Sequence, residues 1–246
     1  MLVKNWIKRA AGVFGLTINR IATADHLLEA RLRELISRLQ IDTVIDVGAN
    51  EGQFSDLLWR IGFKGDVISL EPIRDVYKEL QRSNRKKGWE AYPYACGSQN
   101  GTSILHVAGS GDFSSILDSN RFCLEEFPAA HLIRSDKVEM RRLDSLLPTI
   151  YPNVSERRIL LKMDTQGYDH HVFAGVQGIL DSVQLIQVEM SVIPLYEGAL
   201  PLSAAMKLYL SAGFGVSGMF PVSYTKDRLF VIEYDCLLVS RRPGPS

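Results

Sequence analysis

The pattern of apolar and polar residues between positions 41 and 72 predicts a strand, a helix and a second strand in direct succession. Thr43–Val47 is an apolar, largely β-branched run, which is typical of a buried parallel strand. From 53 to 61, apolar residues recur at the i, i+3, i+4 and i+7 spacing of a helix that packs on a sheet. A second apolar run then ends in Glu71. We therefore predict a β-α-β unit with a glycine turn after its first strand and an acid at the tip of its second.

The same alternation of strands and helices is expected to continue to the C-terminus. Further strands are predicted at 89–95, 159–163 and 183–190, and further helices at 75–87, 168–180 and 202–212. The last apolar segments, 214–220 and 228–239, are separated by a short polar segment, which predicts an antiparallel hairpin. The chain is thus expected to form an α/β domain with a mostly parallel seven-stranded sheet.

Residues 98–158 depart from this alternation. Asn100 and Gly101 form a dipeptide that favours a β-hairpin, and residues 109–115 read as a polar loop. We expect this region to make an excursion of β structure that covers a substrate site.

The glycine turn predicts a nucleoside-containing cofactor. It lies at the carboxyl end of the strands, where open α/β sheets bind ligands, and an acid at the second strand tip can accept both hydroxyls of a ribose. In the dinucleotide fingerprint G-x-G-x-x-G, Asn50 and Gln53 stand where the second and third glycines would be. Asp46 before the turn favours the cationic S-adenosylmethionine (SAM) over a pyrophosphate. A tight turn without a ligand is the alternative.

Two further acids are expected at the same edge of the sheet. Asp164 follows the predicted strand Ile159–Met163, and Glu189 lies near the end of the next strand. Either carboxylate could orient a hydroxyl and accept its proton. The alternatives are that Asp164 caps the following helix and that Glu189 forms a salt bridge inside the domain. A divalent metal between the two is conceivable, but no ligand-spacing motif supports it.

Charge and cysteine content narrow the class of protein. The chain of 246 residues has a formal net charge of zero, which argues against nucleic acid as a partner. Its three cysteines lie far apart and form no disulfide framework, so a reducing cytoplasm is expected. No apolar run reaches the roughly 20 residues of a membrane span. We predict a helical extension at 1–40 and a catalytic domain at 41–246.

Residues 1–24 carry four basic side chains and no acid, with apolar residues on one helical face. One interpretation is a helix that lies peripherally on the inner face of the membrane. The favoured alternative is a helix that docks on its own domain or on a second copy in a homodimer.

Several segments together resemble the FkbM family of SAM-dependent methyltransferases. The resemblance covers about 45 to 240 and rests on VIDVGANEGQFS, SLEP, KMDTQGYDHHVFAGVQGIL and IQVEM. It implies a Rossmann-like class I methyltransferase fold and SAM-dependent O-methylation of a hydroxyl, often on a sugar or polyketide of a secondary metabolite or glycolipid. Gln166 stands where the family usually has Glu. By this resemblance the SAM site is expected to contain Asp46, Gly48, Asn50, Gly52 and Glu71, and we add Ala95 at the end of the third strand.

Two other functions are compatible with parts of the sequence. An NAD-dependent oxidoreductase would share the β-α-β start, but Asn50, Gln53 and the C-terminal hairpin argue against it. A non-catalytic membrane-surface module is suggested by residues 1–24. Titration with SAM and NAD would test the first, and liposome co-sedimentation with and without residues 1–24 would test the second.

Overall fold

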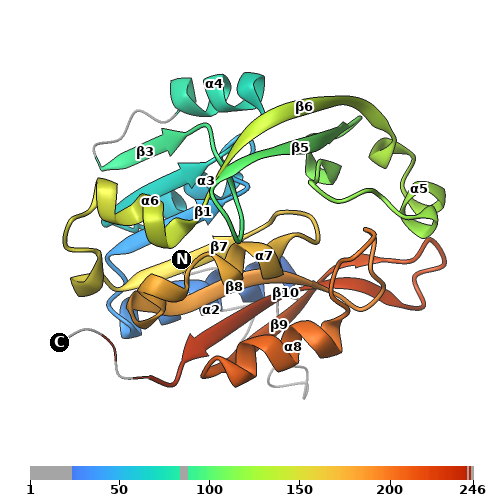
Figure 1. Cartoon of the computed structure of the whole chain (residues 1–246). Coiled ribbons are helices and arrows are strands. Elements are labelled where there is room, and N and C mark those ends of the chain that lie inside the picture. Colours follow the sequence, from blue (N-terminus) through green and yellow to red (C-terminus); the bar gives the residue numbers. More distant parts are fainter. Residues whose placement is uncertain (1–23, 84–87, 243, 245–246) are drawn as a thin grey trace, which may run out of the picture.

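The central feature of the chain is a parallel sheet with helices on both faces (Figure 1). The computed structural model describes residues 24–83, 88–242 and 244. Within them, a seven-stranded sheet has the order β3-β2-β1-β7-β8-β10-β9. Its strands are β1 (Thr43–Val47), β2 (Asp66–Leu70), β3 (Trp89–Tyr92), β7 (Ile159–Met163), β8 (Val183–Ser191), β9 (Phe214–Tyr224) and β10 (Val231–Ser240). β10 runs antiparallel to both of its neighbours, β8 and β9, and the other neighbouring strands of this sheet are parallel. The class I methyltransferase fold, including the C-terminal hairpin, is confirmed.

Helices cover both faces of the sheet because the central strands are apolar on both sides. Ile45 and Val47 of β1 point into one core, and Val44 points into the other. The first core is completed by α6 (Leu143–Ile150), α7 (Asp169–Ala174) and α8 (Leu202–Ser211). The second is completed by α2 (Ala24–Arg38) and α3 (Gln53–Arg60). β1 is therefore buried along its whole length, including its one acid, Asp46.

The register of the central strands brings the predicted site residues to one edge. Val47 at the end of β1 pairs with Leu70 of β2 on one side and with Met163 of β7 on the other. Glu71 and Asp164 each follow directly, so both lie beside the glycine turn. The turn is held there by main-chain hydrogen bonds from Gly48 to Leu70 (3.0 Å) and from Asp164 to Val47 (3.0 Å).

The excursion between β3 and β7, called the cover below, forms a second sheet that lies above the main one (Figure 1). Its order is β4-β6-β5, with β4 (Ala95–Cys96), β5 (Gly101–Ala108) and β6 (Leu132–Arg141). The other helices are α4 (Arg74–Ser83), α5 (Arg121–Glu126) and the short 3-10 segments η1 (Gly111–Phe113), η2 (Pro128–Ala130), η3 (Val154–Glu156) and η4 (Gln177–Ser182).

The hairpin predicted at Asn100 and Gly101 is wrong. β5 begins at Gly101 but pairs with β6, so that Gly101 lies opposite Met140, far along the chain. The Asn100 side chain accepts a hydrogen bond from the main-chain N–H of Arg142 (2.8 Å) instead of closing a turn. A local turn signal is overridden here because the strand finds its partner across the cover.

Two predicted elements are shorter than expected. The third strand ends at Tyr92 because Pro93 has no N–H for a sheet, and Ala95 begins the second sheet. The helix predicted at 168–180 is broken at Gly175, between α7 and η4. A side chain at Gly175 would place its Cβ 2.2 Å from the main-chain oxygen of Gly97, so this glycine lets the two segments touch.

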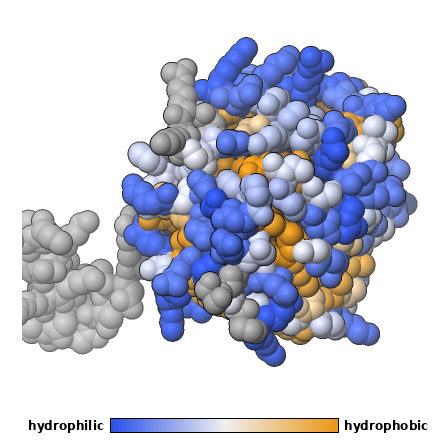
Figure 2. All heavy atoms as spheres, turned by 60° about the vertical axis from the view of Figure 1, so that its left-hand side comes forward, coloured by the Kyte–Doolittle hydropathy of each residue, from blue (hydrophilic) through white to orange (hydrophobic). Residues whose placement is uncertain are grey.

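The end of the molecule on the left of Figure 1 comes forward in Figure 2, where it is mainly hydrophilic, with hydrophobic residues in smaller areas between hydrophilic ones. Among residues 24–83, 88–242 and 244, no helix is long and apolar enough to cross a membrane. The prediction for residues 1–24 falls outside the described residues, apart from Ala24. The domain boundary at residue 40 stays a prediction, while α2 packs into the core of the main sheet through Leu28, Leu32, Leu35 and Ile36.

Candidate active site

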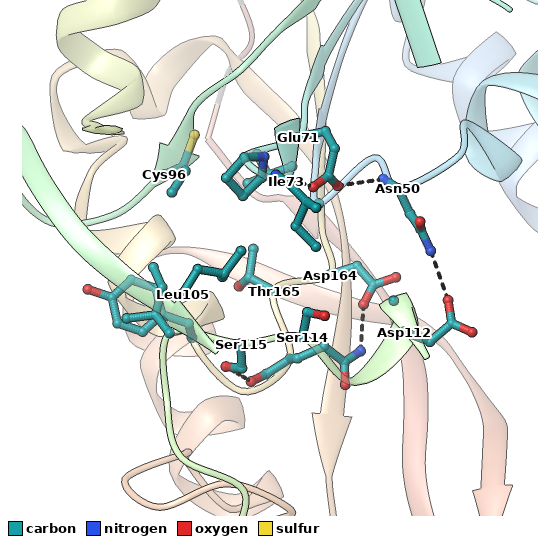
Figure 3. A pocket seen from close by; sticks show the side chains of 18 of the residues that line it. Asn50, Glu71, Ile73, Cys96, Leu105, Asp112, Ser114, Ser115, Asp164 and Thr165 are labelled. Carbon is teal, nitrogen blue, oxygen red and sulfur yellow. Dashed lines mark hydrogen bonds between the residues drawn. The ribbon is translucent and has the colours of Figure 1, made fainter. Parts of the chain in front are cut away.

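A cavity of about 360 Å³ lies at the carboxyl ends of the strands. Its walls come from the turns after β1, β2 and β7, from β8, and from the cover around η1 (Figure 3). A volume of this size falls within the range of small-molecule sites. Four of the lining residues carry carboxyl groups: Glu71, Asp112, Asp164 and Glu189. None of the described residues that line the cavity is lysine, arginine or histidine.

The glycine turn places bare main chain against the neighbouring strand. Gly48 has φ +78°, and a Cβ at this position would lie 2.0 Å from the main-chain oxygen of Asp164. No side chain fits into that space, which explains why the turn begins with glycine. Asn50 also takes a left-handed conformation, with φ +46°, and its side chain donates a hydrogen bond to Asp112 (2.9 Å). The turn is therefore tied to the cover across the cavity (Figure 3).

Glu71 is held at the tip of β2 by two main-chain donors. The N–H of Asn50 bonds one carboxylate oxygen (2.9 Å) and the N–H of Ile73 bonds the other (2.8 Å). Burial raises the pKa of Glu71 to about 7, against the pull of these two hydrogen bonds. Because each carboxylate oxygen can accept more than one hydrogen bond, Glu71 can still receive hydroxyl donors from a ligand.

The predicted cofactor residues divide into two groups. Gly48, Asn50, Glu71 and Ala95 line the cavity. Asp46 and Gly52 are not part of its lining, since Asp46 is fully buried beneath the turn and Gly52 precedes α3 with φ +96°. In this structure these two positions shape the turn, and their place in the cofactor site stays a prediction.

Lys162, which the sequence analysis missed, is buried beneath the glycine turn and holds the site from below without lining the cavity. It lies beside Asp46 in the register of β1 and β7, with its Nζ 3.1 Å from Asp46 Oδ1, 3.4 Å from Asp164 Oδ2 and 3.2 Å from the main-chain oxygen of Gly48. Burial opposes its charge, but the two carboxylates outweigh burial and raise the pKa of Lys162. The available signal was a lysine inside the otherwise apolar strand ILLKM.

Asp164 faces the cavity and does not cap the next helix. α7 has Tyr168 at its N-cap position and no side-chain cap, and Asp169 Oδ1 accepts hydrogen bonds from the main-chain N–H (3.0 Å) and the hydroxyl (2.8 Å) of Thr165, which precedes the helix. The Asp164 carboxylate instead accepts a hydrogen bond from Gln166 Nε2 (2.9 Å). The same amide nitrogen lies 3.5 Å from Glu189 Oε2, so Gln166 stands between the two predicted acids.

Glu189 lies among other acids rather than in a salt bridge. It sits directly across from Asp235 in the antiparallel pair of β8 and β10. Burial, followed by the charges of Glu233, Asp164 and Asp235, raises the pKa of Glu189 well above its ordinary value. The strand tips therefore carry two carboxyl groups with contrasting surroundings.

The cover reaches the strand tips through residues that sequence patterns do not mark. Ser115 donates a hydrogen bond to the main-chain oxygen of Gln166 (2.7 Å). The Tyr196 hydroxyl, from the loop after β8, lies 2.8 Å from Gln166 Oε1 and 3.3 Å from the main-chain oxygen of Phe113. These contacts join residues that are distant in sequence. In the described part of the chain, no group of three or more His, Cys, Asp or Glu side chains is arranged to hold a metal ion.

We expect Glu233→Gln to stabilise the protein at alkaline pH. Glu233 is buried and bonds the hydroxyls of Ser191 and Ser223, and burial raises its pKa to about 7. A carboxyl group with a raised folded-state pKa stabilises fully below its unfolded pKa, and this contribution is lost as pH rises through 7. The variant should therefore gain about 2 kcal/mol at pH 8 and little at pH 5, measured by thermal unfolding.

The exposed Glu79→Gln serves as the matched control for this substitution. It removes the same charge from the solvent face of α4 and should leave stability unchanged at both pH values. Equal destabilisation by Glu233→Gln at pH 5 and pH 8 would contradict the idea that burying the ionised Glu233 carboxylate destabilises the fold.

The sheet order and the acid-lined cavity at its carboxyl edge define a Rossmann-like enzyme of the class I methyltransferase type. The chain belongs to the FkbM methyltransferase family, since the model of the Methyltransferase FkbM domain matches residues 46–216. This confirms the resemblance found in its motifs, and the protein is a methyltransferase.

Individual relatives are more distant. The chain is 27% identical over 198 residues to "2-O-methyltransferase NoeI" of Sinorhizobium fredii (strain NBRC 101917 / NGR234), covering 77% of this chain and 79% of that protein. Among solved structures, an rRNA methylase from Streptococcus thermophilus has a TM-score of 0.48 at 9% identity, covering 91% of this chain and all of that one. The methyltransferase domain of bacterial CtHen1 has a TM-score of 0.47 at 10% identity, covering 89% of this chain and 99% of that one.

Proposed function

We propose that this chain is a SAM-dependent O-methyltransferase that methylates a hydroxyl group of a sugar, carried on a glycolipid or secondary metabolite. The observation that carries the proposal is the charge of the cavity. Its lining contains four carboxyl groups and, among the described residues, no basic side chain. Such a lining suits a cationic ligand and opposes a phosphate.

This charge distinguishes SAM from a dinucleotide. The sulfonium and amino groups of SAM carry positive charge, whereas NAD carries a pyrophosphate. A pyrophosphate site needs main-chain N–H groups free of side chains and acids. Here the Asn50 side chain and the Asp112 carboxylate meet beside the glycine turn, where a pyrophosphate would have to lie.

The residues around the cavity fit the parts of SAM. Glu71, fixed by two main-chain donors, would accept the ribose hydroxyls. Ile73 and Leu105 contribute apolar surface to the lining that suits an adenine ring. The turn at Gly48 would approach the amino acid end of the cofactor through its main chain. SAM, when bound, supplies an electrophilic methyl group on a sulfonium.

The chain's own contribution to the reaction is to position the acceptor and to remove its proton. Holding both reactants in one cavity replaces an encounter in solution by a pair in contact. A sugar hydroxyl is a weak nucleophile at neutral pH, and a carboxylate within hydrogen-bond reach can take its proton as the new bond forms. Asp164 and Glu189 both line the cavity and are the candidate bases.

A hydroxyl acceptor is supported by two observations. The name of the relative from Sinorhizobium fredii describes transfer to oxygen at a 2-position. Carboxylates at neighbouring strand tips are also suitable acceptors for the several hydroxyl donors of a sugar ring.

Calorimetric titration of the purified full chain with SAM, S-adenosylhomocysteine and NAD tests the cofactor. We expect micromolar binding of SAM and S-adenosylhomocysteine and none of NAD. Binding of NAD alone, or of none of the three, would contradict the proposed use of SAM as the cofactor. Transfer of tritiated methyl from SAM to a panel of neutral methyl glycosides then tests the acceptor, with matching deoxy sugars as controls for the methylated position.

A further inference from the structure

The two candidate bases differ in what surrounds them. Asp164 is held from both sides: Oδ2 lies 3.4 Å from the Lys162 ammonium, and Oδ1 accepts a hydrogen bond of 2.9 Å from Gln166 Nε2. Both contacts fix the orientation of the Asp164 carboxylate. The side chain of Asp164 is still 42% exposed, so the fixed carboxylate borders the cavity.

Glu189 has the opposite environment. The strongest charged groups that act on it are four acids: Glu233 and Asp235 of β10, Asp164 after β7 and Asp169 of α7. The Lys162 ammonium on β7 is already occupied by Asp46 and Asp164. The nearby donor is Gln166 Nε2, at 3.5 Å. These surroundings disfavour the charged form, so a proton binds more readily to Glu189 than to an isolated glutamate.

The orientation of Gln166 follows from its neighbours. Its Nε2 must face the acids, because an amide oxygen turned toward Asp164 and Glu189 would meet carboxylate oxygens. Its Oε1 then receives the hydroxyl of Tyr196, which is 2% exposed. Gln166 also adopts φ +53°, an unfavourable conformation for a side chain of this kind, and such strain is frequent at functional sites. A glutamate here would add a further acid instead of a donor.

The sheet order separates the two acids by role. β7 lies next to β1, so Asp164 is beside the cofactor turn, and its main-chain oxygen lies against Gly48. Glu189 is one strand farther away, on β8. With SAM bound at the turn as proposed above, Asp164 would border the donor side and Glu189 the space left for an acceptor.

We propose that Glu189 takes the proton of the acceptor hydroxyl, while Lys162 and Gln166 act as positioning residues that hold the Asp164 carboxylate in a fixed orientation on the donor side. This inference rests on the proposed function. The acceptor O–H bond breaks and its proton passes to the Glu189 carboxylate. The acceptor oxygen forms a bond to the methyl carbon as the carbon–sulfur bond breaks, and that electron pair stays on sulfur.

The first test needs no acceptor. The full chain is labelled with ¹³C at the side-chain carboxyl groups of Asp and Glu, saturated with S-adenosylhomocysteine and titrated by NMR. The signal lost in Glu189→Gln should change protonation well above the ordinary value of about 4.3 for glutamate. A midpoint near the ordinary value would overturn the proposal. Because calorimetry tests SAM binding separately, the two proposals can fail independently.

The second test is the pH profile of kcat with the best glycoside from the panel. With Glu189 as the base, kcat rises with pH through the Glu189 midpoint, and Glu189→Gln lowers kcat by about 10²-fold or more and removes that rise. Asp164→Asn should lower kcat but keep the rise. If Asp164→Asn removes the rise and Glu189→Gln keeps it, the assignment is reversed and the proposal fails.

Gln166→Glu tests the positioning role by a readout that a purely structural residue would not move. An added acid beside Glu189 should shift the rise in kcat upward by about one pH unit or more. The same change at an exposed site of α4, Gln81→Glu, is the matched control and should leave the profile in place. An unshifted profile in folded Gln166→Glu protein would overturn the role of Gln166.

To test Lys162 without leaving Asp46 buried alone, the double variant Asp46→Asn/Lys162→Met removes the buried pair together, and it should lower kcat with a smaller change in KM.

Discussion

Gly48→Ala is expected to destabilise the protein by about 4 kcal/mol and to abolish SAM binding. The added Cβ would lie 2.0 Å from the main-chain oxygen of Asp164 and 3.0 Å from its carbonyl carbon. Both obstacles are main-chain atoms of a central strand end, which cannot rotate away as a side chain could. The φ of +78° adds the strain that an alanine meets in the left-handed region.

Gly62→Ala is a matched control that separates the steric clash of the added Cβ from the strain of the left-handed backbone conformation. Gly62 has a similar φ of +82°, but no atom lies within 4 Å of the position that a Cβ would take there. Gly62→Ala should therefore lower the free energy of unfolding only through backbone strain, by about 1 kcal/mol. Urea unfolding of both variants measures the difference. Equal stabilities would mean that the turn can move away from β7, contrary to the close approach described above.

Glu71→Ala is expected to weaken SAM binding by about 100-fold or more while leaving the fold in place. Hydrogen bonds to a charged acceptor contribute about 1.5–3 kcal/mol each, and two ribose hydroxyls would lose this partner. The substitution also leaves the N–H groups of Asn50 and Ile73 without their side-chain acceptor. Both effects act on the cofactor side of the cavity, so calorimetric titration with SAM measures their sum.

The control for this variant is Glu79→Ala, on the exposed face of the helix that follows β2. It removes the same formal charge, so it reports any effect of net charge alone and should change SAM affinity by less than about threefold. Thermal unfolding verifies that Glu71→Ala protein is folded before it is titrated. Wild-type affinity in folded Glu71→Ala protein would exclude Glu71 as the ribose partner.

Local pattern was sufficient for the main sheet and for part of the site. The strand at Thr43–Val47, the helix after it and the acid that ends β2 follow from apolar spacing that is visible within 30 residues. The hairpin of β9 and β10 could be predicted for the same reason. Glu71, Asp164 and Glu189 could be named because parallel strands bring their carboxyl ends to one edge of a sheet.

Distant contacts decided what local pattern could not. The signal at Asn100 and Gly101 predicted a hairpin, but the strand that follows pairs with the distant strand β6, with Gly101 opposite Met140 and Ala108 opposite Leu132. Pro93 and Gly175 each end an element that periodicity extended, the first through a missing N–H and the second through a close approach to another segment.

The chemical character of the site is likewise a tertiary property. Lys162, a lysine in an apolar strand, can hold the carboxylates at the turn only because β1 places Asp46 beside it. Gln166 becomes a donor to two acids only because the Tyr196 hydroxyl, 30 positions later, meets its other end. The sequence by itself determined which acids end the strands, because strand ends are set by local apolar runs. Only the tertiary structure decided which of those acids is paired with a cation and which is surrounded by other acids, because burial and charge depend on neighbours from separate strands.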